Sequence, residues 1–237
     1  MKEKKNKNLL LGVGIFVFVV FIKLFLSYLD GSSLKDSLTI VFGYIGLQNE
    51  NRFIINFSTW IVPQLAIMLL FGEYFKNELI ANSSLILIRS SSRTKILMQY
   101  IIKLIKNTLV CVLCEIVFVC LLSILKGDKI SIDLIFLCEV ISICMYITML
   151  IVLINAIGLY TKTTYAVVIS IFLECIQVYF IENNIKVARL LPLSGILYEV
   201  AGKELSSVVP LMINSIIWLV VVIVITVVAF RRKKDIM

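Results

Sequence analysis

Residues 134–158, "LIFLCEVISICMYITMLIVLINAIG", form an apolar run that contains one acidic residue, Glu139, and no basic residue. An α-helix rises about 1.5 Å per residue and the hydrocarbon core of a bilayer is about 30 Å thick, so roughly 20 apolar residues are enough to cross it. We therefore predict that this run is a transmembrane helix.

Comparable runs occur along the whole chain. Of its 237 residues, 60% are hydrophobic and 16% are charged, and its mean hydropathy is +1.03. Soluble domains are about half apolar and a quarter charged. We therefore predict an all-α, polytopic membrane protein, in which residues 1–237 form a single transmembrane domain with six transmembrane helices. The predicted spans are 9–29, 53–72, 104–125, 134–158, 164–181 and 209–230.

The basic residues predict the orientation of the spans. The chain starts with "MKEKKNK", and "RRKK" follows the last span at residues 231–234. The first span is too long for a signal peptide and has no small-residue cleavage site, so we predict that it is retained. The loops predicted on the same side of the membrane as the two termini, together with the terminal segments, hold about twice as many Lys and Arg residues as the loops on the opposite side. Because Lys and Arg are enriched in cytoplasmic segments, we predict that both termini are in the cytoplasm.

The same charge distribution argues against a nucleic-acid partner. The net charge is +8, but the basic residues lie at the ends of the spans and in the loops, as membrane topology requires. The composition is rich in Ile, Lys and Asn, which is typical of low-GC bacteria. We therefore expect a multi-pass protein of the bacterial cytoplasmic membrane.

The six cysteines all lie within apolar runs, where we expect them to behave as small buried hydrophobes. Cys111 and Cys114 have the spacing of a metal or redox pair. There is no second such pair and the chain has no histidine, so we predict no metal site.

Some charged residues fall well inside the apolar spans, where an ionisable group costs at least about 2.5–3.5 kcal/mol and usually has a function or a partner. They are Lys23, Glu115, Glu139 and Glu174. Lys23 and Glu139 have similar depths, so they either form an ion pair or reach separately to the outer interface.

Polar residues also follow helical spacing on two spans. Ser170, Glu174 and Gln177 share one face of the fifth span. A second stripe on the third span comprises Lys103, Asn107, Cys111 and Glu115. Facing stripes would line a path for a cationic or amphipathic substrate. Equally, they would hold the helices together through hydrogen bonds worth about 0.6 kcal/mol each on average.

Two loops stand out. Residues 182–208, on the outer side, contain apolar stretches around Pro192 and Gly195. This segment is either a surface loop or one that dips into the bilayer edge, which requires protein to cover its backbone. Residues 85–103, "LILIRSSSRTKILMQYIIK", lie in the cytoplasmic loop between spans two and three. They predict a short apolar and basic helix on the membrane face, which would contact either anionic lipid or another protein.

These loops resemble those of the membrane subunits of ABC-2 type ABC transporters. In that family an acidic residue after span two precedes a short coupling helix, which is followed by a Ser-Arg pair and a hydrophobic residue. Here the matching positions are Glu78, "LILIR", Ser92-Arg93 and Ile96. The family's lysine near position 100 is replaced by Tyr100, with Lys103 one turn later.

Other segments extend the resemblance over most of the chain. The loop "GLYTKTTYA", with Lys162, has the short polar form of the family's second cytoplasmic contact. Residues 182–208 correspond to the family's outer re-entrant helices, and "FRRKKDIM" resembles its basic ending. The resemblance implies that the ATPase-coupling residues are Glu78, Leu85, Ile86, Leu87, Ile88, Arg89, Ser92, Arg93 and Lys162.

The chain has no G-x-x-x-x-G-K-[ST] loop for binding phosphates. The resemblance therefore implies a non-catalytic permease subunit without a cofactor of its own, which pairs with an identical or related permease and with two ATPase subunits that bind ATP and Mg²⁺. Members of this size suggest export or expulsion of a hydrophobic or amphipathic substrate, such as a bacteriocin or lantibiotic in self-immunity, or a drug.

Three other functions were weighed. A substrate-binding membrane component of a vitamin or metal uptake system also has six spans and borrows an ATPase, and is the main alternative. An intramembrane protease would need Lys23 and Ser27 as a dyad, but they lie one turn apart with no oxyanion partner evident. A purely structural or regulatory protein would have no ATPase partner.

Overall fold

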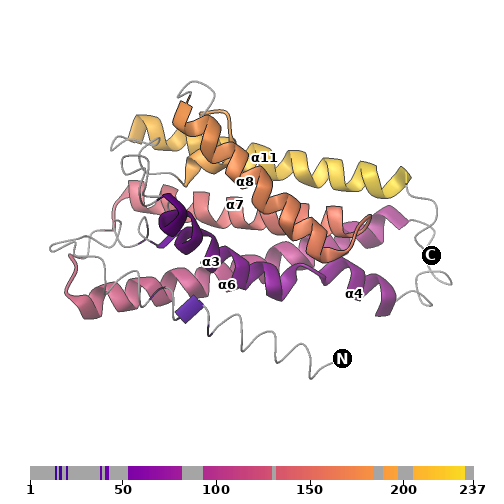
Figure 1. Ribbon diagram of the computed structural model, residues 1–237, viewed down its shortest axis with the longest axis horizontal. Coiled ribbons are helices and arrows are strands. Elements are labelled where there is room, and N and C mark those ends of the chain that lie inside the picture. Colours follow the sequence, from indigo (N-terminus) through magenta and orange to yellow (C-terminus); the bar gives the residue numbers. More distant parts are fainter. Residues whose placement is uncertain are drawn as a thin grey trace.

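The fold is known from a computed structural model, which describes residues 53–81, 93–129, 132–183, 189–196 and 205–232 and the single positions 14, 16, 17, 20, 38, 41 and 42. All regular elements in these residues are helices, which confirms the all-α prediction (Figure 1). They are α3 (Phe53–Phe71), α4 (Tyr74–Ala81), α6 (Arg93–Lys126), α7 (Leu134–Gly158), α8 (Thr163–Asn183), the 3₁₀ helix η2 (Pro192–Gly195) and α11 (Leu205–Arg232).

Four of these helices are long and apolar enough to cross a membrane. They cover Thr94–Lys126, Leu134–Gly158, Thr163–Ile181 and Ser206–Phe230, and they match the third to sixth predicted spans. The second predicted span, 53–72, coincides with the helix α3, which has 19 residues and no charged side chain. Most of the first, 9–29, lies outside the described residues. The described part of the chain is thus helical and contains four helices of this membrane-length kind.

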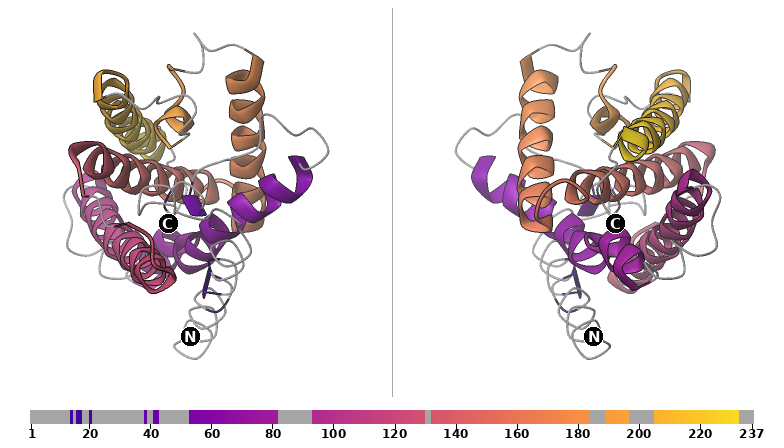
Figure 2. Two further views of the ribbon diagram at one scale, coloured as in Figure 1. Left: turned by 90° about the vertical axis from the view of Figure 1, so that its left-hand side faces the viewer. Right: turned by 90° about the vertical axis from the view of Figure 1, so that its right-hand side faces the viewer.

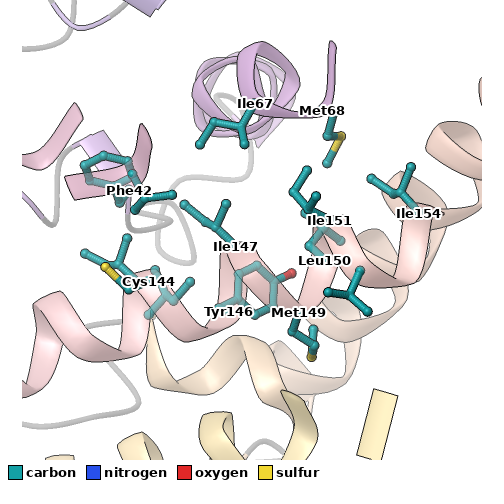
Figure 3. Packing of buried hydrophobic residues seen from close by; sticks show 14 of the residues in the cluster. Phe42, Ile67, Met68, Cys144, Tyr146, Ile147, Met149, Leu150, Ile151 and Ile154 are labelled. Atoms are coloured by element: carbon teal, nitrogen blue, oxygen red, sulfur yellow. The ribbon is translucent and has the colours of Figure 1, made fainter. Parts of the chain in front are cut away.

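The helix α7 lies at the centre of the bundle. It contacts α3, α4, α6, α8, α11 and η2, and Figure 2 shows these elements arranged around it. Its side chains are buried in several directions. Ile147 and Ile151 point toward Ile67 and Met68 of α3, as Figure 3 shows. A helix that is apolar on all sides belongs in the interior, so the run quoted at the outset fixes the position of its neighbours.

The connection from α6 to α7 is fixed by its capping residues. Gly127 has a φ of +94°, a conformation that glycine adopts without steric cost, and its N–H donates to the carbonyl of Ile124 over 3.0 Å. At the start of α7, the Asp133 carboxylate accepts a hydrogen bond of 2.7 Å from the N–H of Phe136. These contacts reverse the chain direction between two membrane-length helices.

Residues 192–196, which lie in the segment 182–208 predicted to be on the outer side, are covered by protein. Pro192, Leu193, Ser194, Gly195 and Ile196 are all buried. Side chains of α8 and α11 satisfy the backbone. Gln177 Oε1 accepts from the Leu193 N–H over 3.2 Å, and the indole of Trp218 donates to the Leu190 carbonyl over 2.8 Å. The backbone of residues 192–196 is therefore covered by protein, which is the condition that a segment dipping into the bilayer edge has to meet.

The Gly195→Ala substitution tests this packing. A Cβ at residue 195 would lie 2.5 Å from Ser215 Oγ and 3.2 Å from the Leu211 carbonyl oxygen of α11, so η2 would have to move. We expect a loss of about 1–3 kcal/mol in the free energy of unfolding, measured by denaturation in mixed micelles and followed by tryptophan fluorescence. Gly14→Ala is the control, because no described residue lies within 4 Å of the corresponding Cβ. Equal effects of the two substitutions would contradict the packing.

Candidate coupling end and buried polar residues

One end of the bundle gathers segments that are far apart in the sequence. We call it the α4 end; it consists of α4, the beginning of α6, residues 159–162 and the last turn of α11 (Figure 1). The hydroxyl of Tyr160 donates a short hydrogen bond to the Ala229 carbonyl of α11, and α4 contacts both α6 and α7. The α4 end contains the described cytoplasmic loops of the predicted topology.

An ion pair holds α4 against α6 at this end. Lys103 Nζ lies 3.2 Å from Glu78 Oε1 and 5.9 Å from the centre of the Tyr74 ring. Lys103 therefore contacts an acidic residue and an aromatic ring on the same short helix. The sequence had placed Glu78 among the coupling residues and Lys103 in a polar stripe of α6. The structure brings these two residues together.

Tyr74 remains a neutral partner in this contact. Burial raises the pKa of its phenol above the ordinary value of 10.0, and the nearby Glu78 carboxylate raises it further, while Lys103 acts in the opposite direction. The cation over the ring is therefore attracted by the π face of a protonated tyrosine at neutral pH.

Three of the predicted coupling positions can be placed at the α4 end. Arg93 is the first residue of α6, Lys162 is exposed just before α8, and Glu78 lies on α4. The rest of the predicted coupling residues, Leu85, Ile86, Leu87, Ile88, Arg89 and Ser92, lie outside the described residues.

The polar face of α8 points into the bundle. Glu174 and Tyr146 of α7 are both fully buried, and the Tyr146 hydroxyl donates to Glu174 Oε1 over 2.8 Å. The other carboxyl oxygen, Oε2, has no hydrogen-bond partner among the described residues. Ser170 donates to the Ala166 carbonyl of its own helix, and Gln177 binds the backbone of η2. The three residues share one face, but they have three different kinds of partner.

The polar stripe of α6 does not face that of α8 within the chain. Both helices pack on α7, on different sides of it in Figure 2, and they make little contact with each other. Glu115 is buried, and its Oε2 atom has no partner among the described residues, while Asn107 is half-buried. Glu139 is half-buried on α7, and its predicted partner Lys23 lies outside the described residues. A path formed by both stripes would need a rearrangement or a second subunit.

Sequence reasoning missed several polar residues that connect helices. Tyr146 binds Glu174, Asn155 binds the junction of α3 and α4, and Trp218, Asn214 and Ser215 of α11 bind the backbone of residues 190–192. Their signal was a single polar or amphipathic residue inside an apolar run, which predicts a hydrogen bond but does not identify its partner.

Comparisons with protein-family models, with curated proteins and with solved structures found no match for this chain. Its function is therefore inferred from its own residues and their geometry.

A double-mutant cycle tests the contact between α4 and α6. Glu78→Gln and Lys103→Gln each remove one charge of a pair whose side chains are 26% and 57% exposed, so solvent screens the attraction. We expect a coupling energy of about 0.2–1 kcal/mol in denaturation measurements, and a smaller value at high salt. Lys106→Gln, at an exposed position on the same helix, should be additive with Glu78→Gln. A coupling energy of zero at low salt would exclude the ion pair.

Tyr146→Phe tests the buried contact with Glu174. Loss of the hydroxyl leaves the buried Glu174 Oε1 without its donor, so we expect a loss of about 1–3 kcal/mol of stability. The double variant Tyr146→Phe/Glu174→Met should cost less than the sum of the single variants, because both polar partners are then removed. Unfolding in mixed micelles measures all three, and strictly additive effects would contradict the bond.

Proposed function

We propose that this chain is the permease subunit of an ABC transporter of the ABC-2 type. It couples ATP hydrolysis by a separate ATPase subunit to the export or expulsion of an amphipathic or hydrophobic substrate, such as a bacteriocin, a lantibiotic or a drug. The observation that carries this proposal is the α4 end, where the short helix α4, the start of α6 and Lys162 lie at one end of the bundle.

The geometry of the α4 end supports docking of a soluble partner. The segment 74–103 and residues 159–162 are separated in the sequence by two membrane-length helices, α6 and α7. A single globular ATPase on one side of the membrane reaches both. The ion pair of Glu78 with Lys103 links α4 to α6, so a push on this region acts on a membrane-length helix and not on a free loop.

The sequence, which has no phosphate-binding loop, supports separate roles for the ATPase subunits and the permease. ATP and Mg²⁺ bind to the ATPase subunits, and the chain itself is non-catalytic and carries no cofactor. Two permease subunits, identical or related, and two ATPase copies form the working complex in the bacterial cytoplasmic membrane. The permease contributes the path through the bilayer and the surface that receives the movement of the ATPases.

The buried carboxyl groups support a cationic amphipathic substrate. Glu174 and Glu115 are acidic residues in the interior of membrane-length helices, and each has an oxygen atom without a hydrogen-bond partner among the described residues. Tyr146 closes over Glu174 in this conformation. Separation of α8 from α7 would break that contact and expose the Glu174 carboxyl group to a peptide amine. Binding of the amine would then be the function of this buried carboxyl group.

Arg93→Glu tests the docking surface. A charge reversal at the start of α6 places an acidic group where the proposal puts an ATPase contact, and like charges at an interface cost several kcal/mol. We expect substrate transport per ATP hydrolysed to fall by about tenfold or more in reconstituted vesicles, with normal membrane insertion. Lys129→Glu is the matched control, because Lys129 is exposed near the opposite end of α6.

Purification of the tagged chain from native membranes in mild detergent identifies the proteins that bind to it. A stoichiometric ATPase that copurifies with the wild-type chain, and that Arg93→Glu binds more weakly than Lys129→Glu does, supports the proposal. A chain that purifies without any ATPase activity contradicts it. A tightly bound small solute together with an ATPase would indicate the uptake component instead.

A further inference from the structure

The helices α3 and α4 are separated by a break at Gly72 and Glu73, and a side chain from a distant helix fills this break. Asn155 of α7 is buried. Its Nδ2 donates to the Phe71 carbonyl over 2.7 Å, and its Oδ1 accepts from the Phe75 N–H over 2.9 Å. One amide thus binds the last residue of α3 and the second residue of α4.

This contact serves groups that a helix break would otherwise leave unpaired. Carbonyls at the end of one helix and N–H groups at the start of the next have no partner within their own helices. Near the bilayer, such groups must be satisfied by protein. Gly72 leaves room at the break for the Met68 carbonyl and for Thr163. A Cβ at residue 72 would lie 2.6 Å from the Met68 carbonyl oxygen and 3.4 Å from Thr163 Cγ2.

Asn155 differs from an ordinary helix cap in the distance along the chain to its partners. A capping side chain binds a backbone group two or three residues away, so its hydrogen bond forms together with its own helix. Asn155 is 84 residues from Phe71 and 80 from Phe75. Its two bonds exist only when α7 is packed against the break, so the position of α4 depends on that of α7.

Asn155 is also connected to residues 159–162. Its backbone carbonyl accepts from the Leu159 N–H over 3.2 Å at the end of α7. The next residue, Tyr160, binds the Ala229 carbonyl of α11. A single residue therefore contacts, through its side chain and its backbone, two of the four segments that make up the α4 end, namely α4 and residues 159–162.

We infer that Asn155 is a positioning residue that joins α4, α7 and residues 159–162 into one unit, so that a displacement of the α4 end moves the central helix. The joining depends only on the contacts described above. Its use in transmitting ATPase movement to α7 rests on the proposed function.

Hydrogen exchange of the full-length chain in lipid nanodiscs tests the joining. Asn155→Leu keeps nearly the same side-chain size and removes both bonds to the break. We expect amide exchange in residues 72–78 to become about tenfold faster, with little change in the outer half of α7. The control is Thr148→Val, a substitution of similar shape at a buried α7 position whose Oγ1 has no partner among the described residues. It should leave exchange in residues 72–78 unchanged.

A second variant keeps the test decisive if Asn155→Leu does not accumulate. Gly72→Ala leaves Asn155 intact but forces the break to shift, because there is no room for the added Cβ. It should likewise speed up exchange in residues 72–78. Wild-type exchange rates in whichever of the two variants folds would overturn the joining.

The transmission role is tested separately in vesicles with the ATPase that copurifies with the chain. Asn155→Leu should keep basal ATP hydrolysis and lower transport per ATP by about tenfold, whereas Thr148→Val should match the wild type. Faster exchange with unchanged transport per ATP would overturn transmission and leave the joining intact. If the wild-type chain has no ATPase partner, the proposed function fails and transmission fails with it, while the exchange measurement still decides the joining.

Discussion

A bilayer offers no water to bind backbone groups, so every break in a helix near it must be satisfied by the protein. In this chain that constraint is met from the central bundle. Asn155 of α7 serves the break between α3 and α4, while Gln177 of α8 and Trp218 of α11 serve the residues around η2. Both irregular segments are therefore tied to membrane-length helices. Neither can be moved without disturbing the helix that completes its hydrogen bonds.

This arrangement explains why isolated polar residues occur in such apolar runs. Lipid tails are as apolar as Leu, so hydrophobic burial does little to select one helix neighbour over another inside a membrane. Close packing and directed hydrogen bonds make the choice. The bond from Tyr146 to Glu174 fixes α8 on α7, as Asn155 fixes the α3–α4 break on the same helix. The central helix thus carries a specific polar contact for each of two neighbours.

The sequence predicted the elements better than their contacts. Run length and hydropathy identified both ends of α7 and placed α8 and α11 to within a few residues, because the bilayer sets their length. The predicted start of the third span was wrong, because α6 begins at Arg93 and not near residue 104. The partners of Asn155 lie 80 and 84 residues away, and no local pattern encodes such a separation. The polar stripes show the same limit. Spacing placed Ser170, Glu174 and Gln177 on one face, but only the packing showed that this face contacts α7 and η2 and that the stripe of α6 lies elsewhere.

The two kinds of polar contact in the bundle differ in how easily they break. The Glu78–Lys103 pair is partly exposed at the α4 end, so water can replace each partner when the contact opens. The Asn155 contact is buried, and opening it would leave the Phe71 carbonyl and the Phe75 N–H without partners. A displacement applied at the α4 end should therefore shear α4 along α6 before it separates α4 from α7. The Glu78–Lys103 pair would therefore open first, and the hydrogen bonds of Asn155 would keep α4 attached to the central helix α7.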